Sequence, residues 1–187
     1  TTYDNENNSH SYEDMDGKTT FISRGAEIAA SRGMLLVNAV GNSGNDSWKY
    51  MGAPADAPSV IAVGAVNSIG NIASFSSYGP TFDGRIKPEI LAQGANAVII
   101  NHVSGAINSS NGTSFSSPIM AGLIACLNQF ESQLLNSSSN SFENKNILLK
   151  KAVFESADKY SNPLNQHGYG IPNFEIALEN YSNSTAS

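Results

Sequence analysis

The sequence predicts an α/β protein built on a parallel sheet, and three segments support this class. Residues 20–32 have a helical pattern that ends at Gly33, and the short apolar segment 34–40 (MLLVNAV) follows at once. Residues 60–66 (VIAVGAV) form a second apolar run of strand length, bounded by turn residues. Residues 118–130 predict an apolar helix that belongs in a core. Helices that alternate with fully apolar strands are typical of a parallel sheet covered by helices.

Composition limits the partners of this chain. Its 187 residues suffice for one domain with a core. Only 14% of them are charged and the net charge is −6, so we expect no nucleic-acid partner and no binding to anionic lipid. No apolar run is long enough to cross a bilayer. Cys126 is the single cysteine; no disulfide can form within the chain, and we expect it to be a small buried hydrophobe.

The first predicted unit is a polar loop or truncated edge over residues 1–18. It is rich in acidic side chains, but their spacing fits no calcium loop, so we assign no metal site. These side chains are Asp4, Glu6, Glu13, Asp14 and Asp16. The helix that follows is capped by Thr20, and its shared face is expected to comprise Phe21, Gly25, Ile28, Ala29 and Arg32.

The turn-like segment 41–46 (GNSGND) follows the first predicted strand. A β-turn is the default interpretation of this composition. Its position is informative, because ligand sites in open parallel sheets gather beyond the carboxyl ends of the strands. Segment 52–59 (GAPADAPS) leads into the second strand and by itself predicts only a turn and core.

Ser114 lies where a small-residue loop meets the apolar helix of residues 118–130. The ordinary interpretation is a helix cap formed by Thr113 or Ser114. The unpaired N–H groups at a helix start also favour negative charge beside that hydroxyl. Pro118 falls too late to be a first-position proline, so we expect it to bend the helix.

Three segments, in this order, resemble the subtilisin-like serine peptidases. They are 39–44 (AVGNSG), 73–90 (ASFSSYGPTFDGRIKPEI) and 112–118 (GTSFSSP) followed by Ala121-Gly122. The segment at 54–66 also fits the family, as does the closing turn 167–173 (HGYGIPN). The family usually has alanine where this chain has Ser117 or a neighbouring small residue, and often proline where it has Gln93. The motif G-x-S-x-G of other acyl hydrolases is absent around Ser114, which argues against an esterase or lipase.

The resemblance implies a three-layer subtilisin-like fold and a serine peptidase site. Ser114 would be the nucleophile and Asn42 the side-chain donor of the oxyanion hole. Ala39, Gly41, Gly52 and Ala53 would line the pocket for the residue before the scissile bond. The catalytic Asp and His of the family stand in motifs upstream of everything present here, so the fold is expected to be incomplete. Asp83 is better interpreted as turn or salt-bridge material.

The histidines His10, His102 and His167 lack the family's His-Gly-Thr context. We therefore expect none of them to act as the catalytic base, and the isolated chain to be inactive.

The rest of the chain completes the predicted domain of residues 19–178. Residues 97–100 and 106–107 predict a strand pair, and residues 136–144 a surface linker. Leu149, Ala152, Val153 and Ser156 share one face of a helix that begins near Lys145. A short helix is expected over 174–178, with a frayed tail over 179–187.

Two hypotheses remain for the function. The first is a fragment of a serine endopeptidase that forms an acyl-enzyme on Ser114; the alternative is a catalytically dead relative that binds ligands. The partners would be a peptide or protein substrate, and the missing amino-terminal half or a second copy of the chain, because an incomplete parallel sheet leaves an open edge. The resemblance implies a secreted or cell-envelope protein without a cofactor in this part, although a structural calcium is possible in the full-length protein.

Overall fold

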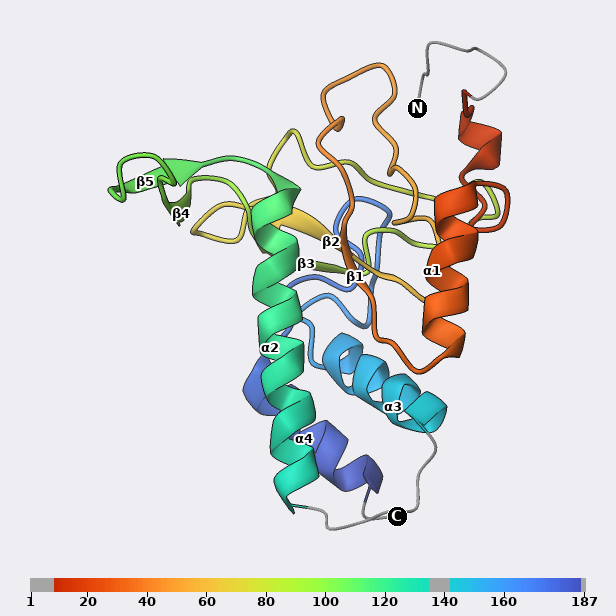
Figure 1. Cartoon of the computed structure of the whole chain (residues 1–187), viewed down its shortest axis with the longest axis vertical. Helices are drawn as coiled ribbons and strands as arrows, with labels where there is room; N and C mark the ends of the chain where they lie inside the picture. The colour runs from red at the N-terminus through yellow and green to blue at the C-terminus, as the bar shows by residue number, and fades with distance from the viewer. Residues whose placement is uncertain (1–8, 135–141, 186–187) are drawn as a thin grey trace.

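The computed structural model describes residues 9–134 and 142–185. A short 3-10 helix, η2 (Tyr12–Asp14), precedes α1 (Phe21–Ser31), and the strands β1 (Val37–Ala39), β2 (Ile61–Val66) and β3 (Ile90–Gln93) follow. The hairpin β4 (Ala97–Ile100) and β5 (Ile107–Ser110) leads into α2 (Thr113–Leu134). Two further helices, α3 (Phe142–Glu155) and α4 (Phe174–Thr185), end the described chain (Figure 1).

The three central strands form a parallel sheet in the order β1-β2-β3. Val37 pairs with Ile61 and Val63 with Ile90, so the strands are in close register. Every residue of β2 is buried, as expected for the middle strand of a sheet that is covered on both faces. This architecture confirms the predicted α/β class and its parallel sheet.

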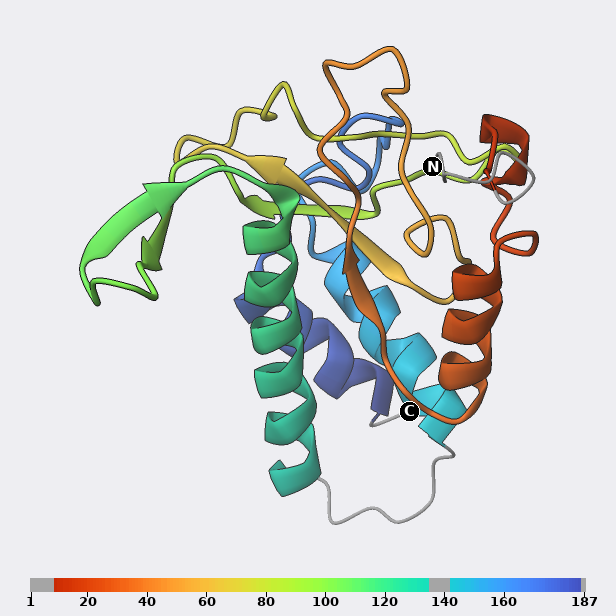
Figure 2. The ribbon, with the colours of Figure 1, turned by 45° about the horizontal axis from the view of Figure 1, so that its top comes forward.

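Alternate strand residues face two different layers, because side chains of a strand point to opposite faces in turn. Ile61 and Val63 face a large core cluster formed with α2, α3 and α4. On the opposite face, Ala62 packs with Met15 and Met51, and α1 contributes Ala26 to a third cluster. Figure 2 shows the long helix α2 and the pair α3 and α4 on the same side of the sheet.

The α1 helix begins and ends as predicted but turns a different face to the core. Thr20 caps it, accepting a hydrogen bond from the Ser23 backbone N–H at 3.2 Å. Ser23 and Ala26 are buried, whereas Phe21 and Ile28 of the predicted face are 82% and 62% exposed. Residues 9–18, predicted as a loop, contain η2 and bury Met15 completely.

The α2 helix is longer than predicted, and it buries only one of its apolar rows. It starts at Thr113 and continues through Pro118. Its buried side chains are Met120, Ile124 and Leu127, whereas Ile119 and Leu123 are 43% and 39% exposed. The prediction that Cys126 is buried is therefore wrong: Cys126 is exposed at the edge of a groove between α2 and α4.

Two other elements differ from the predicted pattern, and two agree with it. Strand β3 was not expected, and it ends at Gln93. The strand pair is confirmed as the antiparallel hairpin β4–β5, and the predicted buried face of α3 is confirmed. The α4 helix runs to Thr185 instead of fraying after residue 178, because Tyr181 is completely buried. Part of the predicted linker, residues 136–141, lies outside the described residues.

None of the helices in the described part of the chain has the length and apolar character needed to span a membrane.

Candidate active site

The hydroxyl of Ser114 lies in the first turn of α2, beyond the carboxyl ends of the central strands. The turn that leads to it is fixed by a hydrogen bond from the Gly112 N–H to the Gly94 carbonyl oxygen at 2.8 Å. Gly94 follows β3 directly, and a β-carbon there would lie 2.7 Å from the Gly112 carbonyl oxygen. Only glycine allows the two backbones to approach so closely. Ser114 itself is exposed, and its Oγ makes no hydrogen bond within the described structure.

Asn42 follows β1 by three residues and is joined to the same helix start. Its Oδ1 accepts hydrogen bonds from the Thr113 backbone N–H at 2.8 Å and from Thr113 Oγ1 at 2.9 Å. A backbone N–H can only donate, so this pair of bonds settles which side of the carboxamide carries the oxygen. The Nδ2 group is left with its donors free among the described residues. A β-carbon on Gly112 would lie 3.7 Å from this nitrogen.

A second loop, residues 75–77, holds the segment that carries Asn42. The Gly44 N–H donates to the Phe75 carbonyl oxygen at 2.8 Å, and the Ser77 N–H donates to the Gly41 carbonyl oxygen at 2.9 Å. Ser77 Oγ accepts from the Ser43 N–H at 2.9 Å. Gly41 has φ of 117°, which favours glycine, and a β-carbon there would lie 2.9 Å from Ser77 Oγ. The sequence of residues 75–77 does not by itself predict this supporting role.

The residues predicted to line the substrate pocket lie around the end of β1. The Gly52 N–H donates to the carbonyl oxygen of Val40, the residue between Ala39 and Gly41, at 3.3 Å. Ala53 is the next residue of the same loop, and its side chain is half-buried beside the cluster that contains Met51. The structure therefore brings all four predicted positions to one end of the sheet.

The three histidines lie in other parts of the fold. His10 Nδ1 is 3.5 Å from Asp14 Oδ2 near the amino end, and His102 belongs to the turn between β4 and β5. His167 Nδ1 lies 2.8 Å from the Gly168 carbonyl oxygen in the loop before α4. Within the described residues, none of them hydrogen-bonds with Ser114.

Asp83 forms an ion pair, as predicted, with Arg85 Nε at 2.9 Å. Desolvation acts to raise the pKa of this carboxyl group, but hydrogen bonds from Arg85 and Thr81 outweigh it and keep the pKa below its ordinary value. Over residues 9–134 and 142–185, no three side chains of His, Cys, Asp or Glu gather as metal ligands would. Asp4 and Glu6 lie outside these ranges.

Several known proteins are similar to this chain. Residues 4–170 match the model of the subtilase family. The chain is 33% identical over 172 residues to subtilisin-like protease SBT6.1 of Arabidopsis thaliana, covering 86% of this chain and 15% of the relative. It is 40% identical over 110 residues to subtilisin DY of Bacillus licheniformis, covering 58% of this chain and 38% of that protein.

Solved structures show the same fold. The prenylagaramide maturation protease PagA superimposes with a TM-score of 0.66 at 26% identity, over 86% of this chain and 55% of that one. The PatG macrocyclase domain gives a TM-score of 0.67 at 23% identity, over 86% of this chain and 47% of the domain. The chain thus spans about half of these two structures and a smaller share of the two curated relatives.

Proposed function

The chain belongs to the subtilase family, and from this premise we propose that it supplies the nucleophile and one oxyanion donor of a serine endopeptidase site. Ser114 is the proposed nucleophile, and Asn42 Nδ2 together with the Ser114 backbone N–H are the proposed donors. The chain carries the later strands and the long helix of the catalytic domain, and the rest of the domain supplies the base and the acid.

The hydrogen bonding of Asn42 carries this proposal. Its carboxamide oxygen is held by both donors of Thr113, so the amide nitrogen is turned to the other side with its hydrogens available. Oxyanion stabilisation needs such a donor fixed in place before charge develops, because then no reorganisation is needed during the reaction. The exposed hydroxyl of the adjacent Ser114 is accessible to a substrate carbonyl.

The proposed reaction is acyl transfer through a covalent intermediate. Ser114 Oγ attacks the scissile carbonyl carbon while a base removes its proton, and the carbonyl oxygen becomes an oxyanion that Asn42 Nδ2 and the Ser114 N–H bind. The C–N bond then breaks, the amine leaves with the proton, and water hydrolyses the ester. A serine hydroxyl is a poor nucleophile without an adjacent base, so we expect the isolated chain not to turn over substrate.

The substrate is proposed to be an extended peptide that passes the carboxyl ends of the strands. The side chain before the scissile bond would enter the space bordered by Ala39, Gly41, Gly52 and Ala53. The mutual hydrogen bonding of these two segments supports a single pocket wall. A secreted or cell-envelope setting is proposed from the family alone.

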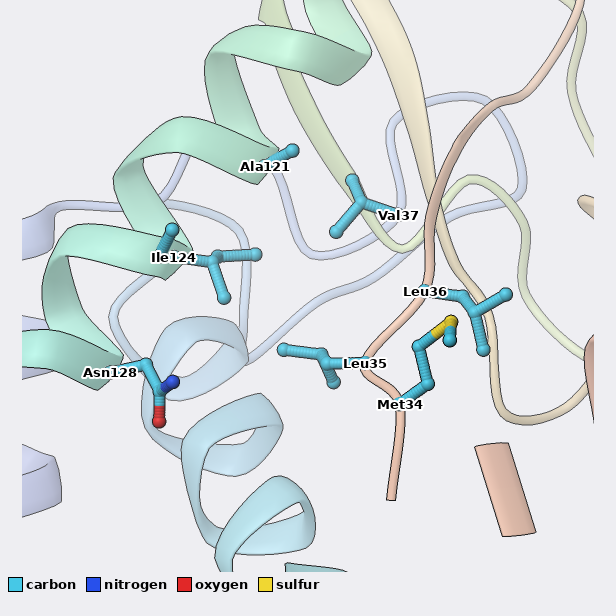
Figure 3. Close-up of a pocket in the computed structure, with 8 residues that line it drawn as sticks. Met34, Leu35, Leu36, Val37, Ala121, Ile124 and Asn128 are labelled. Atoms are coloured by element: carbon cyan, nitrogen blue, oxygen red, sulfur yellow. The ribbon is translucent and has the colours of Figure 1, made fainter. Parts of the chain in front are cut away.

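The open edge of β1 is the proposed contact with the rest of the domain. β1 pairs only with β2 among the described strands, and its residues are half-buried. Beside it lies an apolar cavity of about 470 Å3 between residues 34–37 and the α2 side chains Ala121, Ile124 and Asn128 (Figure 3). Met34 is 59% exposed there. An unpaired edge next to an uncovered apolar surface favours association with a further strand, from the rest of the domain or from a second copy.

Two measurements test the catalytic proposal in the protein that contains the whole domain. Ser114→Ala should abolish peptide hydrolysis, and a fluorophosphonate probe should add its mass at Ser114 in the parent protein but not in the variant. Hydrolysis that persists in the variant would refute the nucleophile. A complete domain that neither reacts with the probe nor hydrolyses peptides would favour the alternative of a binding module.

The partner proposal has its own test by sedimentation velocity. The chain alone should self-associate, and the upstream part of the domain, when added, should convert it to a one-to-one complex. Met34→Asp should weaken either assembly, with the exposed Ile69→Asp as the control on another surface. A chain that stays monomeric and binds no upstream part would contradict the proposal.

A further inference from the structure

A buried carboxylate that the proposed reaction does not use lies in the pocket-wall loop, defined as residues 52–57. Asp56 is completely buried. Its Oδ1 accepts a hydrogen bond from Ser23 Oγ at 2.6 Å, and its Oδ2 accepts one from the Gly17 backbone N–H at 2.7 Å. Asp56 thereby joins the pocket-wall loop to the first turn of α1 and to the segment before that helix. A carboxylate this deeply buried is costly unless hydrogen bonds compensate it, and these two bonds do so.

Arg85 closes the same connection from a third segment. Its Nη1 donates to the Asp56 carbonyl oxygen at 2.7 Å, and its Nη2 donates to the Asp16 carbonyl oxygen at 3.0 Å. The ion pair with Asp83 orients the guanidinium group through Nε. The planar, rigid guanidinium group of Arg85 therefore binds both the pocket-wall loop and the segment before α1.

The packing around Gly17 leaves little space for movement. Gly17 has φ of 76°, and a β-carbon there would lie 2.6 Å from Pro58 Cδ and 2.9 Å from Arg85 Nη2. The segment before α1 is thus pressed against the pocket-wall loop at the point where Asp56 and Arg85 bind it.

The opposite end of the pocket-wall loop is attached to the proposed site. The Gly52 N–H donates to the Val40 carbonyl oxygen. Within the loop, the Ala55 N–H donates to the Gly52 carbonyl oxygen at 2.9 Å, and the Ala57 N–H donates to the Pro54 carbonyl oxygen at 3.0 Å. The loop is therefore a short hydrogen-bonded unit with two attachments. Movement at the Asp56 end has to be passed on to Gly52 and Ala53, which border the substrate side chain.

We propose that Asp56 and Arg85 are positioning residues that set the width of the pocket for the residue before the scissile bond. This inference rests on the proposed function, because it requires that Gly52 and Ala53 bind substrate. Neither side chain touches the reacting atoms. Their effect is on selectivity: a fixed wall distinguishes a side chain that fills the pocket from one that leaves it empty, and a loose wall does so less well.

The decisive variants are Asp56→Ala and Asp56→Asn. Alanine leaves the Gly17 N–H and the Ser23 hydroxyl without their acceptor. Asparagine restores both, because its Oδ1 accepts from Gly17 while its Nδ2 donates to Ser23 Oγ, and the Ser23 hydroxyl then donates to Thr20 Oγ1 instead of accepting from it. Val153→Ala is the matched control. Val153 is also completely buried, but it lies in α3 and packs in the core cluster on the other face of the sheet, away from this loop.

The assay uses the complete catalytic domain and peptide substrates that differ only in the residue before the scissile bond. In Asp56→Ala, kcat/KM for the best-cleaved peptide should fall about tenfold through KM, while kcat/KM for the glycine peptide changes less than about twofold. Asp56→Asn and Val153→Ala should keep the ratio of the two peptides within about twofold of the parent. An equal fall for both peptides, or no fall, would overturn the inference.

A second readout separates this inference from the proposed function and needs no activity. Hydrogen exchange of the Ala55 and Ala57 amides should accelerate about tenfold in Asp56→Ala but not in Asp56→Asn or Val153→Ala. If Asp56→Ala does not fold, Ser23→Ala removes one of the two donors and should shift both readouts in the same direction by a smaller factor. If the hydrogen-exchange rates of the Ala55 and Ala57 amides do not change in these variants, Asp56 does not hold the pocket-wall loop in place. Hydrolysis that persists in Ser114→Ala would instead refute the proposed function alone.

Discussion

Replacing Thr113 with valine tests how the oxyanion donor is oriented. Thr113 is completely buried, and valine has nearly the same shape, so the packing should be kept. The substitution removes the 2.9 Å hydrogen bond from Oγ1 to Asn42 Oδ1 and also removes the acceptor of the Gly41 N–H at 3.3 Å. The bond from the Thr113 backbone N–H to Asn42 stays in place.

The size of the effect follows from what is lost and what remains. A neutral hydrogen bond contributes about 0.5–1.5 kcal/mol, and the bond to Gly41 is long and half-exposed, so it adds little. If the less well oriented donor stabilises the transition state by about 1.4 kcal/mol less, kcat falls about tenfold. KM should hardly change, because the negative charge on the oxygen develops on the way to the tetrahedral intermediate and is absent from the bound substrate. Asn42→Ala, which removes the donor itself, should lower kcat by about two to three orders of magnitude.

The assay is steady-state hydrolysis of one peptide substrate by the complete domain. Thr113→Ser keeps the hydroxyl and should restore kcat to within about threefold of the parent, which makes it the control for local packing. If kcat of Thr113→Val equals that of the parent while Asn42→Ala is strongly impaired, Thr113 does not orient the amide. If Asn42→Ala is also unimpaired, Asn42 is not the oxyanion donor.

Three further predictions concern stability and can be checked by urea unfolding of the protein. Ser116→Ala should raise the free energy of unfolding by about 1 kcal/mol, because Ser116 Oγ is buried without a hydrogen-bond partner in the described structure. The control Ser156→Ala breaks a 2.7 Å hydrogen bond to the Val153 carbonyl oxygen and should lower the free energy of unfolding. The opposite order of the two variants would contradict the reasoning. Gly25→Ala should stabilise by about 0.5–1 kcal/mol, since Gly25 lies inside α1 and a β-carbon there meets nothing within 4 Å; a loss of stability would mean that the position is covered. Asp83→Asn should flatten the acid limb of the curve of unfolding free energy against pH. The pKa of Asp83 is lowered in the folded state, so its carboxylate stabilises the fold above the ordinary pKa near 3.8, and this stabilisation disappears as the pH falls through the folded-state pKa. An unchanged acid limb would exclude this contribution to stability.

Local signals in the sequence were sufficient for most of the elements. Thr20 caps a helix because its own hydroxyl accepts from Ser23, and the run from Ile61 to Val66 is apolar because both faces of β2 are covered. Strand β3 was missed for an equally local reason. It has only four residues and follows a proline closely, so it offers no periodic pattern long enough to be distinguished from the surrounding turns.

Contacts between distant segments could not be predicted from the same signals. Asn42 and Thr113 are 71 residues apart, and only the closed fold shows that one holds the other. Asp56 was passed over because alanine and proline around it predict a turn. Its one unusual property is that it is the single charged residue of an apolar loop. This indicates a buried carboxylate only when hydrogen-bond donors such as Ser23 and Gly17 are known to lie beside it.

The apolar rows of α2 bear on the proposed assembly. In α2, two neighbouring rows of side chains are apolar, one containing Met120 and Ile124 and the other Ile119 and Leu123, so periodicity alone cannot rank them. The sheet and α4 cover the first row, whereas the second is only partly covered, with Leu123 bordering a groove against Phe174 and Leu178 of α4. The cavity beside the open edge of β1 is lined by Ala121, Ala125 and Asn128 of the same helix. At 3.6 residues per turn these side chains lie on the opposite side of α2 from Ile119, Leu123 and Cys126. Filling the β1 edge is therefore expected to cover the row that contains Ala121 and to leave Cys126 exposed.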